Sequence, residues 1–240
     1  MISNQTFITN QPYFINSYLS NVTIDNSTFY DINSDGSILT LIDTVIKISN
    51  VEAYGLHTAS AGRFIKLSFN SVANFSRINY TDSTMKLIES QSSQSQIMDL
   101  MATNISLTQH LIDYIDCNEV ILQNSMIYNV NSTSSYLMYA ARSSLNQISN
   151  MTVHDINVAV FNILRSNVST IDNLYIHNVA NGIHFHQSSV DRFMNSRIHH
   201  SGSKDIKQGG ALLIQNSNST IHNLTFDSNT AQSGGAINID

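Results

Sequence analysis

A short sequence phrase recurs along the whole chain at intervals near 24 residues. It reads apolar, any, marker, any, any, apolar, any, small polar, and the marker is Asn in eight of ten copies. The residue two positions before the marker is apolar in all ten copies, from Ile2 to Ile221. A repeat of this length cannot bury its apolar side alone, so successive copies must stack on one another. The chain is therefore predicted to be a solenoid. The markers are Asn4, Asn26, Asn50, Arg77, Asp99, Asn124, Asn150, Asn173, Asn195 and Asn223.

The pattern within each repeat favours strands over helices. Apolar residues alternate in short bursts, as in 64–67 and 158–161, and Ser, Asn, Gly and Thr separate the bursts. Such bursts are typical of short strands between turns. About 24 residues supply three short strands and three turns, which make one coil of a parallel β-helix. The predicted fold is all-β, a single β-helix domain of about ten coils that spans residues 1–240.

The marker Asn is predicted to sit at a bend. The apolar positions lie two residues before it and three after it, an odd spacing that a straight strand would send to opposite faces. Asn tolerates the left-handed conformation that a tight bend needs. Stacked Asn side chains can hydrogen-bond from coil to coil, so an Asn ladder is expected. These side chains are expected to point inward, and Asn104, in the small polar position five residues after a marker, is expected to do the same.

The coil size and the Asn ladder resemble the right-handed parallel β-helix of the pectin-lyase-like superfamily. Near the C-terminus, the segments 209–212 (Gly-Gly-Ala-Leu), 226–229 (Phe-Asp-Ser-Asn) and 234–237 (Gly-Gly-Ala-Ile) are similar to the GGA(I/L/V) and FxxN repeats of polymorphic membrane proteins and related microbial surface β-helices. The resemblance implies a right-handed β-helix at a cell surface.

Composition is consistent with an extracellular or cell-surface protein. Charged residues make up only 12% of the chain, whereas Asn, Ser and Thr supply about a third of it. The net charge of −6 does not indicate a basic surface for nucleic acid, and no apolar run approaches the ~20 residues of a membrane span. The single cysteine, Cys117, is expected to be buried and unpaired. No cofactor is expected. Both ends of the sequence are predicted to be ready to continue the stack, so self-association end to end, into filaments, is expected, or else neighbouring coils in a longer chain.

Eleven Asn-x-Ser/Thr sequons occur, and their positions in the repeat divide them into inaccessible and accessible sites. Because the ladder is expected to face inward, the sequons at Asn26, Asn150 and Asn223 are predicted to be inaccessible, and so are those at Asn4 and Asn104. The remaining sequons fall in turns or on outward positions, and they are the candidate glycan sites of a glycoprotein. These sites are Asn21, Asn74, Asn79, Asn131, Asn167 and Asn218.

One set of polar residues is a candidate carbohydrate groove. The longest insertions, near 59–62, 131–135 and 201–208, share the third turn, where binding loops of solenoids often lie. Pectin-lyase-like relatives act on polysaccharides along the outer face of the first strand of each coil, but the paired-Asp, Gly-His-Gly and Arg-x-Lys signatures of polygalacturonases are absent here. No catalytic residue is therefore assigned. Stacked coils five to eight still build a polar patch, which is either a carbohydrate groove or a solvated face with weak ion pairs. It comprises Asp113, Asp116, Tyr139, Arg142, Asn162, Arg165, His184 and His186.

A second candidate is a histidine column four residues after the marker. It holds His154, His177 and His199 in successive coils, followed by Asp227. These groups could bind Zn²⁺ or another divalent ion. A straight ladder does not readily converge on one tetrahedral centre, however, so an exposed stack of like rings is the favoured interpretation.

The predicted function is that of a structural or adhesive extracellular β-helix protein. The alternative is a protein that binds or cleaves polysaccharides, with carbohydrate as its ligand. The missing acid–base signatures favour the first function, and the Asp113 to His186 patch supports the second.

Overall fold

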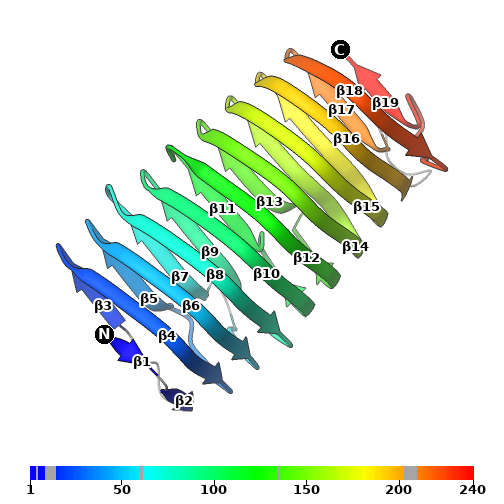
Figure 1. The fold of residues 1–240 in the computed structure, drawn as a ribbon. Helices are drawn as coiled ribbons and strands as arrows, with labels where there is room; N and C mark the ends of the chain where they lie inside the picture. Colours follow the sequence, from blue (N-terminus) through cyan, green and yellow to red (C-terminus); the bar gives the residue numbers. More distant parts are fainter. Residues whose placement is uncertain (4, 9–14, 60–61, 135, 203–209) are drawn as a thin grey trace.

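The computed structural model describes residues 1–3, 5–8, 15–59, 62–134, 136–202 and 210–240, and these form a parallel β-solenoid. Long strands such as β4, β6 and β8 lie side by side on one face of the rod, and shorter ones such as β5, β7 and β9 line another (Figure 1). The two ends of the chain lie at opposite ends of the rod (Figure 1). Within the described ranges, no helix could cross a membrane.

The strands are β1 (Ile2–Ser3), β2 (Thr6–Ile8), β3 (Ile15–Tyr18), β4 (Asn21–Tyr30), β5 (Ser37–Ile42), β6 (Val45–Tyr54), β7 (Arg63–Ser68), β8 (Val72–Thr81), β9 (Lys86–Gln91), β10 (Gln94–Leu107), β11 (Ile112–Ile115), β12 (Val120–Ser132), β13 (Tyr136–Ala141), β14 (Ser144–Leu164), β15 (Asn167–His186), β16 (Ser189–Ser201), β17 (Leu212–Gln215), β18 (Asn218–Asp227) and β19 (Ile237–Ile239).

The predicted apolar column is confirmed in register. From Ile2 to Ile221, each apolar residue before a marker pairs with its counterpart in the next coil, which gives nine steps of about 24 residues. Ile48, Ile148 and Ile171 are fully buried in this column. The apolar residues three positions after the markers also stack without a break. Burial of these two columns supplies the continuous core of the solenoid.

Each coil bends where a residue adopts the left-handed conformation. Every marker from Asn26 to Asn223 has φ between 46° and 57°. A second bend falls five residues after each marker from Asn26 to Asn223, at the position where the sequence carries Asn, Asp, Gly, His or Ser. Asn, Asp and His are the non-glycine residues that tolerate this region best. The small polar position of the repeat is therefore a second corner. Its residues are Asp31, Gly55, Asp82, Asn104, Asn129, Asp155, Asn178, His200 and Ser228.

The predicted direction of the marker side chains is wrong. Asn26, Asn150 and Asn223 are exposed, and so is Asn104 at the second corner. The left-handed bend turns the marker outward while the apolar residues on both sides of it face the core. The ladder itself is present on the outside of the rod: Asn150 Nδ2 donates to Asn124 Oδ1 at 3.0 Å, and Asn173 Nδ2 donates to Asn150 Oδ1 at 2.9 Å. The marker Asn4 lies outside the described residues, as do parts of the three insertions.

A third corner carries a buried stack of hydroxyl groups. A left-handed residue is followed there by a small polar one, as in Arg142-Ser143 and Arg165-Ser166. The Ser143 amide donates to Ser166 Oγ at 3.0 Å, and the Ser143 hydroxyl donates to the Ala141 carbonyl at 2.9 Å. Cys117 occupies this position in its own coil, and its amide donates to Ser143 Oγ at 3.0 Å. Cys117 is thus buried and unpaired, as predicted.

Replacement of Asn150 separates two contributions to the unfolding free energy, that of the backbone bend and that of the ladder hydrogen bonds. Asn150→Ala should lower the unfolding free energy by about 1–3 kcal/mol, because Ala is strained at positive φ and two ladder bonds are lost. Asn150→Gly loses the same bonds but adopts the bend without strain, so it should cost less. Denaturant titration measures both variants. Equal losses in the two variants would show that the bend does not constrain residue 150.

Candidate functional site

Stacking brings four residues of the predicted groove into one outward column. Asp113 on β11 pairs with Tyr139 on β13, which pairs with Asn162 on β14 and then His184 on β15. Glu89 on β9 precedes Asp113 in the same column. The coils are stacked about 4.8 Å apart, so neighbouring side chains of this column are in contact range.

The other half of the predicted groove lies along the third corner of the coils. One of its predicted residues, His186, is replaced there by Gln187. Asp116 accepts two hydrogen bonds from Arg142, at 2.6 and 2.9 Å. Arg165 Nε donates to Gln187 Oε1 at 2.8 Å, so Gln187 continues this line and His186 does not. His186 instead pairs with Leu164 in the strand register. The prediction missed that the bend precedes the buried hydroxyl by one residue, which shifts the outward position from His186 to Gln187.

A cluster of charged residues that the sequence analysis missed surrounds Asp113. The Lys86 ammonium contacts the Asp113 carboxylate and lies 3.3 Å from Glu89 Oε2. Arg63 Nε donates to the same Glu89 oxygen at 2.9 Å. His110 Nδ1 lies 2.6 Å from Asp113 Oδ1. Lys86 is only 4% exposed and Asp113 only 7%, so this is a largely desolvated network of paired charges.

Aromatic rings cover one side of this network. The His110 ring stacks on Tyr139, with centroids 5.3 Å apart, and lies 6.2 Å from Tyr136. Tyr136 meets His184 edge to face at 5.7 Å. The four rings therefore form a continuous aromatic surface beside the buried ion pairs. We call these rings, together with Arg63, Lys86, Glu89 and Asp113, the His110 cluster.

Burial and pairing set the protonation states in the cluster. Burial alone would raise the pKa of Asp113, but the hydrogen bond from His110 and the charge of Lys86 outweigh it, and the pKa is lowered. Asp113 is therefore ionised at neutral pH. Burial lowers the pKa of His184 to about 4, and its Nε2 is buried without a hydrogen-bond partner. His184 is therefore neutral at neutral pH.

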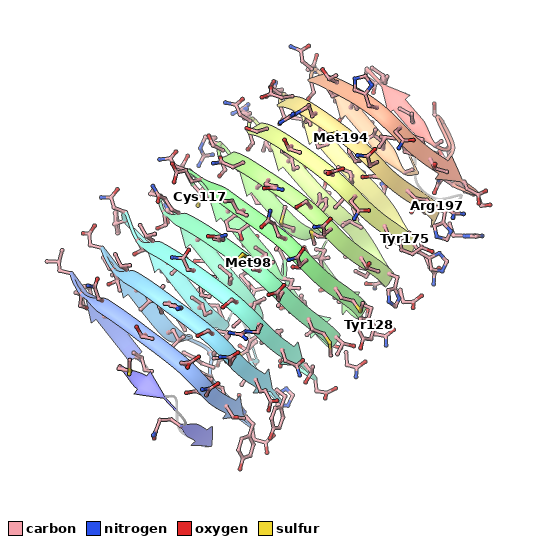
Figure 2. The ribbon with its side chains drawn as sticks, in the orientation of Figure 1. Met98, Cys117, Tyr128, Tyr175, Met194 and Arg197 are labelled. Atoms are coloured by element: carbon pink, nitrogen blue, oxygen red, sulfur yellow. The ribbon has the colours of Figure 1, made fainter. Side chains whose placement is uncertain are left out.

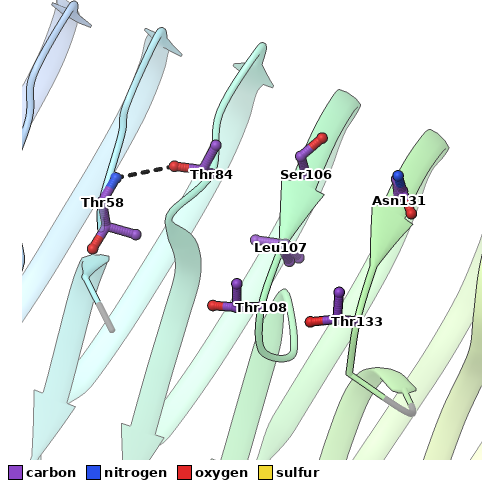
Figure 3. A pocket seen from close by; sticks show the side chains of 7 residues that line it. All are labelled: Thr58, Thr84, Ser106, Leu107, Thr108, Asn131 and Thr133. Carbon is purple, nitrogen blue, oxygen red and sulfur yellow. Dashed lines mark hydrogen bonds between the residues drawn. The ribbon is translucent and has the colours of Figure 1, made fainter. Parts of the chain in front are cut away.

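A groove with a volume of about 300 Å³ follows the turn just before the cluster. Hydroxyl groups from successive coils line it, and the Thr58 amide donates to Thr84 Oγ1 at 3.0 Å (Figure 3). Thr108 is two residues before His110, and Thr133 is three residues before Tyr136. In each of two coils, therefore, one short chain segment contributes a residue to the groove and another to the His110 cluster. The lining residues are Thr58, Thr84, Ser106, Leu107, Thr108, Asn131 and Thr133.

Part of the cluster follows from the repeat and part of it does not. Lys86 and Arg63 pair with one another at the start of their strands, and this register could have been read from the repeat. His110 lies in the third turn, where coil lengths vary and the repeat gives no register, and Tyr136 follows that turn in the next coil as the first residue of β13. Their convergence on Asp113 is therefore a result of the three-dimensional structure alone.

The predicted histidine column is present, but its members have different neighbours. His154, His177, His199 and Asp227 are in register across four coils. His154 stacks on Tyr128 at 5.0 Å and bonds Asp155 at 2.8 Å, so it belongs to the predicted ring stack. In the part of the chain that the structure describes, only one group of three or more histidine, cysteine or acidic residues has its ligand atoms within 4.8 Å of one another. Its members are His177, His199 and His200.

Most of the candidate glycan sites are accessible, but exposure does not distinguish them from the sequon asparagines of the ladder. Asn79 is half-buried, and the other five candidates are exposed. The sequons at Asn150 and Asn223 are also exposed, contrary to the prediction, but their amide nitrogens donate across coils to Asn124 and Asn195. The exposed candidates are Asn21, Asn74, Asn131, Asn167 and Asn218.

Comparison with known proteins gives only weak structural similarity. No family model matches the chain, and no curated protein matches it by sequence. The structure is similar to the A-module of the mannuronan C-5 epimerase AlgE4 from Azotobacter vinelandii, with a TM-score of 0.21 and 10% sequence identity. The similarity covers 92% of this chain and 91% of that module. A score this low carries no argument about function, so the proposal below depends on the site itself.

The buried neutral state of His184 predicts a pH dependence of stability. Below pH ~6.5 the unfolded chain gains a proton at residue 184 that the folded chain does not take up until about pH 4. The unfolding free energy should therefore fall by about 1–3 kcal/mol between these pH values because of this one group. The substitution His184→Leu should flatten that part of the pH profile.

Urea titration at several pH values measures this slope. His222→Leu is the matched control, because His222 is exposed on β18 and should leave the slope unchanged. If the profiles of wild type and His184→Leu ran parallel, His184 would be accessible to water.

Proposed function

We propose that this chain is a polysaccharide-binding β-helix, a structural or adhesive protein that acts outside the cell or at its surface. The observation that supports the proposal is the continuous aromatic surface of His110, Tyr136, Tyr139 and His184 beside paired charges. Sugars present apolar C–H faces to aromatic rings and hydroxyl groups to polar side chains, so they suit such a surface.

The cluster is also rigid before any ligand binds. Ion pairs hold Lys86 and Asp113, and His110 is held by both a hydrogen bond and a ring stack. A rigid surface loses less conformational entropy on binding than a flexible one. The neighbouring groove offers threonine and serine hydroxyl groups along several coils, which would suit an extended chain that lies along the rod.

The carboxylates do not favour hydrolysis. A glycoside hydrolase needs one carboxyl group that is protonated and another that is ionised. Glu89 and Asp113 both contact Lys86, and the pKa of Asp113 is lowered rather than raised. Asp113 therefore holds no proton to donate to a leaving group at neutral pH. The charge states of these carboxylates therefore favour binding over hydrolysis.

One contact favours catalysis as a second candidate function. Asp113 bonds Nδ1 of His110, and a carboxylate in this position orients an imidazole to accept a proton at its other nitrogen. Tyr139, stacked on His110, adds a hydroxyl group that could donate a proton. The alternative is therefore a polysaccharide-acting enzyme in which His110 is the base.

Affinity for polysaccharides tests the binding proposal. Wild type should bind at least one of pectin, polygalacturonate, alginate or a neutral β-glucan in affinity electrophoresis. Tyr139→Ala should weaken that binding at least ~10-fold, since loss of one aromatic contact costs about 1.4 kcal/mol or more. Tyr54→Ala is the control, because Tyr54 stacks on Tyr30 in a distant column. Absence of binding to all four polymers, or equal losses in the two variants, would reject the proposal.

Product analysis on the same polymers tests the second candidate. Release of unsaturated or reducing ends, with or without Ca²⁺, should be lost in His110→Gln if His110 is a base. Arg142→Ala and Arg165→Ala should retain it, because these exposed arginines lie at the third corner, outside the cluster. Wild type that binds a polymer and releases no new ends would exclude cleavage and leave the binding proposal intact.

A further inference from the structure

Three histidines converge at the second corner of the coils near the C-terminus. His199 and His200 are adjacent on β16, and in a regular strand their side chains would point to opposite faces. His200 instead has φ of 51°, and the bend turns both rings to the same side of the rod. His177 lies directly beneath His199 in the register of β15 and β16. Figure 2 shows Tyr175 and Arg197 along the same edge of the solenoid.

The ring nitrogens are spaced as ligands of one ion would be. His199 Nδ1 and His200 Nδ1 are 3.0 Å apart. Two nitrogens that each lie about 2.0–2.1 Å from a shared zinc ion stand roughly 3 Å apart or slightly more. His177 Nδ1 is buried and makes no hydrogen bond, although its ring lies 4.3 Å from that of His199. All three ligand atoms fall within 4.8 Å of one another.

A neighbouring side chain already orients one of the three rings. Tyr175 Oη lies 2.7 Å from His199 Nε2. When the Nε2–H of His199 donates to this oxygen, Nδ1 of the same ring carries a lone pair directed at His200. Metal-bound histidines are commonly fixed by such an outer hydrogen bond. Tyr175 therefore plays a positioning role in the cluster.

The surrounding charges allow a cation to bind. Arg197 lies close by and faces the carboxylate of Asp227 at 3.6 Å. Asp227 is in register with His199 in the next coil and adds a negative charge to the same edge.

We propose that His177, His199 and His200 form a binding site for a divalent transition-metal ion, with Zn²⁺ as the reference ion. Three imidazoles suit zinc, copper, nickel or cobalt and disfavour calcium and magnesium, which require oxygen ligands. A water molecule would complete the coordination. Without the ion, Nδ1–H of His200 donates to Nδ1 of His199. When the ion binds between the two nitrogens, this proton leaves Nδ1, and the His200 ring carries its proton on Nε2 instead. The site lies in a different column and a different turn from the His110 cluster, so it is independent of polysaccharide binding.

Metal titration of the untagged chain tests the site. Wild type should bind one Zn²⁺ per chain in calorimetry, and bound Co²⁺ should show the intense visible absorption of a four-coordinate ion. His200→Asn should weaken Zn²⁺ binding at least 100-fold. Asn fits the left-handed bend, as Asn178 does one coil earlier, so this variant should keep its fold.

Two further variants exclude general effects. His154→Asn removes a histidine of the same column that lies outside the trio, and it should leave Zn²⁺ binding unchanged. Tyr175→Phe should weaken binding roughly 10-fold, as expected for loss of an outer-shell hydrogen bond. The proposal is overturned if wild type binds no Zn²⁺, or if His154→Asn and His200→Asn weaken binding equally.

Discussion

The left-handed bend that recurs at the same places in every coil is the constraint on which the rest of the structure depends. Most residues other than Gly adopt this conformation at a cost, which is smallest for Asn and Asp. The sequence supplies Asn, Asp or Gly at most of the markers and at most of the positions five residues later, so each coil turns where the previous one turned. Coils of equal shape can stack in parallel, and the apolar residues on either side of each bend then fall into continuous buried columns.

Stacking in register converts sequence spacing into contact. Asp113 and Tyr139 are 26 residues apart in the chain and are paired neighbours in the sheet. The same relation places Glu89 against Asp113 and His177 beneath His199. A polar residue on the outer face is therefore never isolated, because the coils above and below supply its neighbours. Both candidate sites arise in this way, one around Asp113 and one around His199.

The sequence was sufficient to predict what depends on the repeat. The buried column through Ile148, the ladder through Asn150 and the pairing of Asp113 with Tyr139 all follow from marker spacing. The outward direction of Asn150 was predicted incorrectly, because the spacing indicates that the chain bends but not toward which side the bent residue points.

The missed contacts lie where the repeat carries no information. His110 belongs to the third turn, whose length changes from coil to coil, and Tyr136 directly follows this turn at the start of β13. Marker spacing therefore does not connect them to Asp113. His200 occupies a corner with positive φ, and only the contact between its ring and that of His199 shows that the two rings face the same side. The sequence signal for this site was the adjacent pair of histidines at the small polar position of the repeat.

Distances between spin labels on the outer face test the coil register most directly. Met101, Met126, Thr152, Tyr175, Arg197 and Thr225 occupy one column in successive coils. Labels at Met101 and Arg197, four coils apart, should lie about 19 Å from one another, and labels at Met101 and Thr225, five coils apart, about 24 Å. Cys117→Ser, which matches the hydroxyl stack, removes the native thiol. An increase of one coil spacing between the two pairs would support the register, whereas equal distances, or a shorter distance for the second pair, would contradict it.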